Sequence, residues 1–133
     1  MNKEFIPHEQ ALSLKELGFD LPCIAIWWNF DNSFSYSYDE IAEDMDIGDH
    51  NKNDVHISAP LYQQAFRFFR EKYKLHNGIY PYYDEYEFQI KDFNSTKNTP
   101  INGGIMSYEE AELECLKKLI EIVNAAAIKD NNQ

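Results

Sequence analysis

The chain has 133 residues, of which 44% are apolar and 15% aromatic, so it can bury a core without disulfide or metal support. Disordered segments contain few aromatic residues, and this composition therefore excludes disorder over the whole chain. The formal net charge of −11, from 23 acidic and 12 basic residues, disfavours direct binding to nucleic acid and to anionic membranes, because both are negatively charged.

We expect a cytoplasmic protein. The first five residues lack the basic-then-apolar layout of a signal peptide. No apolar run approaches the roughly 18 residues of a membrane span. The two cysteines, Cys23 and Cys115, occur in apolar segments, where free cysteine is usually a small buried hydrophobic residue.

A short helix is predicted from about Pro7 to Leu17. Proline suits the first helical position because the backbone N–H that it lacks would have no partner within the helix there. Gly18 can adopt the left-handed conformation that ends many helices, and Phe19 would then contact Leu14, as in a Schellman ending.

The next segment predicts a β-hairpin. Residues 23–28 form a continuous apolar run, typical of a strand buried on both faces. Residues 29–32 favour a turn. Residues 34–38 alternate strictly between aromatic and serine side chains, which indicates a half-buried strand.

Residues 39–54 are strongly acidic, and we tested them for a calcium loop. Such a loop needs glycine at its sixth position. A loop beginning at Asp44 has Asp49 there, and one beginning at Asp49 has Asp54. Both registers fail, so we expect a solvated acidic loop, in which one helical turn around Ile41 and Met45 fits the pattern.

A second helix is predicted after Ser58, which would cap it, with Pro60 in its first turn. Its apolar residues recur at spacings of three and four and end before His76: Leu61, Tyr62, Ala65, Phe66, Phe69 and Tyr73. The basic residues of segment 67–74 are interpreted as a solvated helix face.

A second hairpin follows, with arms at residues 79–83 and 86–90 and a turn at 84–85. Pro81 cannot donate to a strand ladder, so its strand is placed at a sheet edge. Residues 94–104 are expected to form a loop.

The last helix is predicted to begin after Ser107, because Ser107 and Glu110 form a capping box. Its apolar side continues to Val123. The complete pattern predicts one α+β domain over residues 1–128, with a tail at 129–133 that frays. Its fold would be an N-terminal helix followed by two β-β-α units, giving a four-stranded antiparallel sheet with helices packed on one face.

No catalytic, cofactor or metal site is predicted. The four histidines are far apart in sequence; His50 and His56 flank one loop and are not expected to form a metal site. Both cysteines fall on packing segments, where a thiol is inert. The sequence contains neither a nucleophile elbow nor a phosphate-binding glycine loop. We therefore predict a protein that is not an enzyme.

The surplus of aromatic residues has two interpretations. Tyrosine and tryptophan pack into half-buried strands, and they are also enriched at interface hot spots. If one sheet face is uncovered, these side chains would form a recognition surface, with the acidic loop as a further contact. The candidate partner-binding residues are Trp27, Trp28, Tyr36, Tyr80, Tyr82, Tyr83, Asp44 and Asp46.

Residues 9–20, 57–73 and 108–120 together resemble a group of small proteins of Bacteroidetes phages, prophages and related mobile elements. These stretches cover the three predicted helices. No activity is assigned to that group. The resemblance therefore implies a setting, that of an accessory protein acting on host or phage components, and no catalytic residue.

Three hypotheses of function follow. The first is a non-enzymatic accessory protein that binds a protein partner through its aromatic sheet or acidic loop. The second is an acidic decoy that imitates nucleic acid and occupies a DNA-binding protein. The third is a small-molecule binder or enzyme with an aromatic pocket, whose sign would be a deep cavity with a few convergent polar groups.

Overall fold

Two units make up the chain, Met1–Ala65 and Phe66–Gln133, and their boundary lies within one helix, α2 (Tyr62–Tyr73). The computed structural model describes residues 2–39, 44–45, 47–52, 54–95, 100–104 and 106–131. The protein is α+β, as predicted, but the single four-stranded sheet is wrong. The strands form two three-stranded antiparallel sheets and a separate two-stranded ladder. One domain over residues 1–128 stays a prediction.

The first unit begins with a short 3₁₀ helix, η1 (Asn2–Glu4), and helix α1 (His8–Glu16). Pro7 is the extended residue that precedes α1, and is not its first helical residue. The predicted Schellman ending is confirmed: Gly18 has φ 87°, and the Phe19 amide donates to the Leu14 carbonyl at 2.9 Å. Phe19 and Leu14 are both buried.

The sheet of the first unit has β1 (Ala25–Trp28) at its centre, between β2 (Phe34–Tyr36) and β5 (His56–Ser58). The predicted first hairpin is confirmed, because β1 pairs antiparallel with β2. Strand β5 was not predicted, because Ser58 was expected to cap the second helix.

Ser58 therefore does not cap α2. It lies in β5, where its hydroxyl accepts a hydrogen bond from the His50 backbone amide at 3.0 Å. Pro60 precedes the helix instead of opening it. The start of α2 is fixed by Gln64, whose side-chain oxygen accepts from the Leu61 amide at 3.0 Å, one half of a capping box.

Within the acidic segment, β3 (Tyr38–Asp39) pairs with β4 (Asp44–Met45). Met45 is thus in a strand and not in the helical turn that the sequence allowed around Ile41 and Met45. Residues 40–43 and 46 lie outside the described residues.

The second unit contains a long hairpin of β6 (Leu75–Tyr82) and β7 (Glu85–Asp92). The second predicted hairpin is confirmed, although its two-residue turn is Tyr83–Asp84, with Tyr83 at φ 55°. Strand β8 (Ile101–Asn102) pairs with β7, which corrects the loop expected over 94–104.

Pro81 lies on an edge strand, as predicted, because the strand order is β6-β7-β8. The Phe88 carbonyl accepts from the Gly103 amide, so the backbone groups of Phe88 point toward the β8 side. Their partners on β6, Ile79 and by the same alternation Pro81, point toward the free edge. The missing N–H of Pro81 therefore removes no ladder hydrogen bond.

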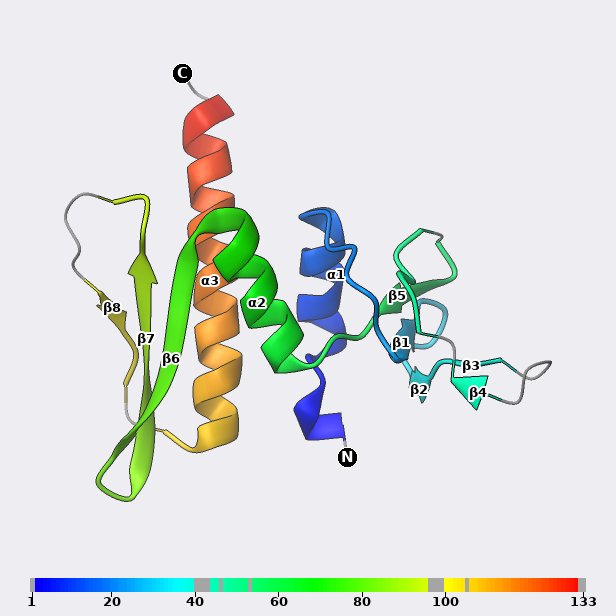
Figure 1. The fold of residues 1–133 in the computed structure, drawn as a ribbon, viewed down its shortest axis with the longest axis horizontal. Helices are drawn as coiled ribbons and strands as arrows, with labels where there is room; N and C mark the ends of the chain where they lie inside the picture. Colours follow the sequence, from blue (N-terminus) through cyan, green and yellow to red (C-terminus); the bar gives the residue numbers. More distant parts are fainter. Residues whose placement is uncertain are drawn as a thin grey trace. The chain divides into compact units, whose positions relative to one another are not determined.

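Helix α3 (Tyr108–Asn131) runs along one face of the β6–β7 hairpin (Figure 1). Its predicted cap is confirmed by the hydrogen bond from the Glu110 amide to the Ser107 hydroxyl at 3.2 Å. The helix continues into segment 129–133. No helix within the described ranges is both long enough and apolar enough to cross a membrane. The hairpin and α3 are packed through apolar side chains. The buried residues are Leu75, Phe88 and Ile90 on the strands, and Ala111, Cys115, Leu116, Leu119, Ile120 and Val123 on the helix.

Candidate functional site

The candidate residues of the first unit are mostly packed. Trp27 donates its indole N–H to the Ile6 carbonyl at 3.0 Å, and its ring lies 5.3 Å from Phe34, centroid to centroid. Tyr36 packs edge-on against Phe5 at 5.8 Å. Trp27 and Tyr36 thus belong to an aromatic cluster on one face of the β1–β2 hairpin, where hydrogen bonding and ring packing account for them.

Trp28 projects from the opposite face of β1. Its indole N–H donates to the Ser35 hydroxyl at 2.9 Å, and its ring lies 5.5 Å from His56 and 5.8 Å from Phe30. The two tryptophans, which were predicted to share one recognition surface, therefore lie on opposite faces of the sheet.

The acidic candidates of the same unit remain predictions. Asp44 is described only as part of the β4 ladder. Asp46 lies outside the described residues, and so do several neighbouring acidic positions.

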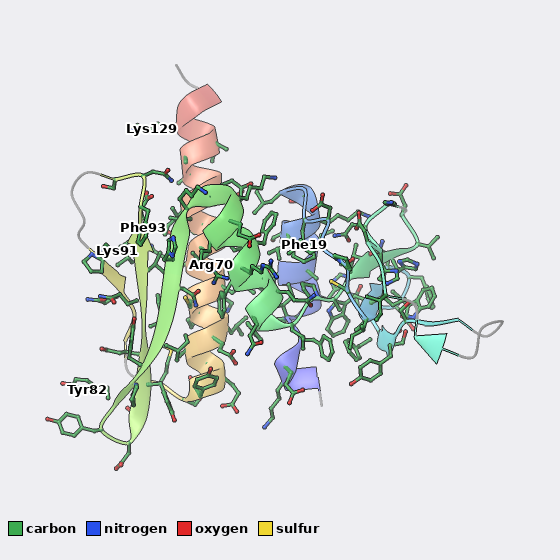
Figure 2. All side chains as sticks on the ribbon, in the orientation of Figure 1. Phe19, Arg70, Tyr82, Lys91, Phe93 and Lys129 are labelled. Atoms are coloured by element: carbon green, nitrogen blue, oxygen red, sulfur yellow. The ribbon has the colours of Figure 1, made fainter. Side chains whose placement is uncertain are left out.

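Within the described residues of the second unit, one face of the hairpin is uncovered near the turn. Directly opposite residues on antiparallel strands share a face, so Tyr82 pairs with Glu85, and Tyr80 with Glu87, on the face away from α3. Figure 2 shows Tyr82 near the tip of the hairpin, directed away from α3. Tyr80 and Tyr82 are 48% and 44% exposed.

The ring of Tyr80 lies flat on the sheet because residue 78 is glycine. A Cβ placed on Gly78 would come within 2.5 Å of the Tyr80 hydroxyl oxygen and within 2.6 Å of two of its ring carbons. The tyrosine ring therefore covers the space that a side chain at position 78 would need. The ring thus lies against the strand at Gly78, while about half of the residue stays exposed (48%).

The tip of the hairpin adds a third tyrosine. Tyr83 occupies the first turn position and is 91% exposed. Its ring packs edge-on against Tyr82 at 4.9 Å, which restricts the orientation of both. Asp84, beside it, is also exposed.

The carboxylates on this face, Glu85 and Glu87, form no ion pair with any described residue. The opposite end of the same face has a different character: His76 stacks on Phe93 at 3.7 Å, and the Lys91 ammonium lies 5.5 Å from the Phe93 ring. Figure 2 labels Lys91 and Phe93 there. The acidic aromatic face is therefore limited to the half of the hairpin near the tip.

Neither cysteine is suited to nucleophilic chemistry. Burial raises the pKa of the Cys23 thiol to about 12, and burial likewise raises the pKa of Cys115 to about 12. Because the thiolate is the nucleophile, both side chains are unreactive thiols at neutral pH. Their burial as free cysteines agrees with the expectation from sequence.

His50 and His56 do come together, with ring centroids 5.6 Å apart. Each ring, however, hydrogen-bonds a backbone carbonyl: His50 Nε2 lies 3.0 Å from the Cys23 oxygen, and His56 Nδ1 lies 3.2 Å from the His50 oxygen. These contacts tie the loop before β5 to the start of β1. Among the described residues, no group of three or more His, Cys, Asp or Glu side chains is placed to hold a metal ion.

The basic segment on α2 is partly neutralised. Arg67 donates to Glu71 at 2.8 Å, and this contact lowers the pKa of Glu71. The Lys72 ammonium lies 5.3 Å from the Phe68 ring. These contacts fit the interpretation of a solvated helix face.

Comparisons with protein-family models, with curated proteins and with solved structures give no match. The candidate site therefore depends on the geometry described above.

Sequence reasoning found the three hairpin tyrosines and missed their acidic partners and the glycine beneath them. Placing the turn one residue late assigned Glu85 to the loop. The alternation of residues 86–90 was the available signal for Glu87, since it puts Glu87 on the face opposite Phe88 and Ile90.

Proposed function

We propose that this chain is a non-enzymatic protein-binding module that takes a cationic segment of a partner protein on the outer face of its β6–β7 hairpin. We call this face the hairpin surface; it consists of Tyr80, Tyr82, Tyr83, Glu85 and Glu87. The observation that carries the proposal is the placement of exposed tyrosines directly across the strands from carboxylates that form no ion pair within the described residues.

The side chains of the hairpin surface suit recognition. Tyrosine supplies a large contact area with few rotatable bonds, so little conformational entropy is lost on binding. A two-stranded platform backed by α3 holds the rings in place before the partner arrives. Preorganisation of this kind lowers the cost of association.

Charge selects the class of partner. The hairpin surface carries Glu85 and Glu87, with Asp84 beside them, and the whole chain has a net charge of −11. A cationic partner would be attracted over several ångströms at low salt, which increases the association rate. An acidic segment would be repelled.

An accessory role fits this proposal. The resemblance to small proteins of Bacteroidetes phages and mobile elements supplies a setting in which a partner would be a host or phage component. The two free buried cysteines support a reducing, cytoplasmic location. The acidic candidates Asp44 and Asp46 belong to the first unit and are not part of this surface.

The test is a tagged pull-down from a host-type lysate, with the wild type and two variants as bait and native mass spectrometry as the readout. The variant Tyr80→Ala/Tyr82→Ala removes the hairpin rings. Phe30→Ala is the matched control, because Phe30 is an aromatic residue that is 78% exposed on the first unit. We expect a stoichiometric protein that the wild type and the control recover and the double variant loses. Equal recovery by all three baits would overturn the proposal.

A further inference from the structure

We propose that the hairpin surface recognises two arginines at alternate positions of an extended segment. This inference rests on the proposed function and specifies the partner's chemistry. The observation behind it is that the same pair, one tyrosine and one glutamate, occurs twice on one face of the hairpin: Tyr82 opposite Glu85, and Tyr80 opposite Glu87.

The repeat distance fixes the spacing of the ligand. Residues two apart on a strand point to the same face and are separated by roughly 6.6 Å. An extended peptide has the same period, so its alternate side chains would meet the two tyrosine–glutamate pairs in register. Adjacent basic residues would point to opposite sides of the peptide, and only one of them would reach the surface.

Each pair offers both parts of a guanidinium site. The ring of Tyr80 lies against Gly78, and the side chain is 48% exposed; a cation over an exposed ring face is attracted by the ring quadrupole. The Glu87 carboxylate lies directly across the strands from the same tyrosine. At the second pair, Tyr82 lies opposite Glu85 in the ladder, and its ring packs edge-on against Tyr83.

Arginine fits this arrangement better than lysine. Its planar guanidinium can stack on a ring and hydrogen-bond a carboxylate in its own plane at the same time. The lysine ammonium is compact and strongly hydrated, so its attraction to the ring is weaker, and it has no planar group that can stack on the ring while hydrogen-bonding the carboxylate.

The surface accommodates two such side chains but not a longer run of basic residues. The next pair along the strands, Gly78 opposite Gln89, has neither an aromatic ring nor an acid. The pair after it is His76 opposite Lys91, where a further arginine would meet a like charge. At the other end the strands stop at the turn.

The experiment is an NMR titration of the ¹⁵N-labelled full chain with short, otherwise Gly/Ser peptides. One peptide has two arginines separated by one residue, a second has the arginines adjacent, and a third replaces both arginines of the first with lysine. We expect the first peptide to shift the amide signals of β6 and β7 near the tip. Its affinity should exceed that of either control by about 2- to 5-fold, the factor that one exposed cation–π contact supplies.

Two variants make the outcome specific. Tyr82→Ala should weaken the first peptide by about 2- to 5-fold, whereas Tyr82→Phe, which keeps the ring, should bind it like the wild type. Equal affinity for all three peptides, or shifts confined to the first unit, would overturn the arginine assignment. So would self-association of the chain that Tyr82→Ala abolishes, since a second copy would then be the occupant. If the partner that the Tyr80→Ala/Tyr82→Ala bait fails to recover has no alternate arginines, this inference is overturned and the proposed function stays intact.

Discussion

Replacing Gly78 with alanine tests the hairpin surface without removing any of its five side chains. The new Cβ would lie 2.5 Å from the Tyr80 hydroxyl oxygen and 2.6 Å from ring carbons Cε2 and Cζ. Such distances are not tolerated, so one group must move. The tyrosine ring is the far end of a flexible side chain, and we expect it to swing off the strand while the backbone stays in place.

The stability of the fold should change little. Moving the ring away from its preferred rotamer costs about 0.5–1.5 kcal/mol. Replacing a strand glycine with alanine returns about 0.5–1 kcal/mol, because the unfolded chain has less freedom to lose. The free energy of unfolding of Gly78→Ala should therefore lie within about 1 kcal/mol of the wild-type value, as measured by urea denaturation.

Binding should respond more strongly than stability. Loss of one ring platform removes about 0.5–1 kcal/mol, which corresponds to about a 2- to 5-fold weaker affinity for the alternate-arginine peptide. Gly104→Ala is the matched control, because a Cβ at Gly104 meets no atom within 4 Å. If Gly78→Ala bound the peptide as tightly as the control, the flat Tyr80 ring would not be the platform.

Three further changes test the fold. Gly103→Ala would push a Cβ into the buried Phe88 ring, and overpacking of this kind should cost about 1–3 kcal/mol in urea unfolding; an unchanged midpoint would contradict that contact. Ser107→Ala removes the cap of the Glu110 amide and should cost about 1 kcal/mol, which Ser107→Thr should largely retain. Burial raises the pKa of Glu112, so its ionised form opposes folding at neutral pH. Glu112→Gln should therefore raise the free energy of unfolding at pH 7, and the difference should vanish below about pH 3, where the wild-type side chain is protonated in both states. A difference that persists there would refute the assignment.

The sequence was most informative where structure is set by neighbouring residues. The Schellman ending at Gly18 and the cap at Ser107 each depend on backbone groups within about five residues, and both are confirmed. The two hairpins are also local, and only the turn of the second was displaced by one residue.

Pairing between distant segments could not be predicted in the same way. Strands β5 and β8 have three and two residues, and neither has an alternating pattern of its own. They are strands because a longer strand lies beside them and supplies hydrogen-bond partners. For the same reason, the four recognised strands were merged into one sheet: apolar alternation shows that a strand has a buried face and does not identify its neighbour.

The candidate site was predictable in composition and not in geometry. Aromatic residues in strands were evident, but Trp27 and Tyr36 pack against Phe5 and its neighbours, whereas Tyr80 and Tyr82 remain exposed. The difference depends on which sheet face is covered. That coverage is decided by Phe5 and Ile6, between η1 and α1, in one unit and by α3 in the other, and no local pattern reports it.

The most direct test of the account is to find where a partner touches this chain. A photoreactive phenylalanine analogue would replace Tyr82 in one bait and Phe30 in another, with cross-linking in a host-type lysate followed by sequencing of the attached peptide. We predict a cross-link from position 82 alone, to a segment with arginines at alternate positions. A partner that cross-links from position 30 and not from position 82 would contradict it, because the docking surface would then lie away from the hairpin.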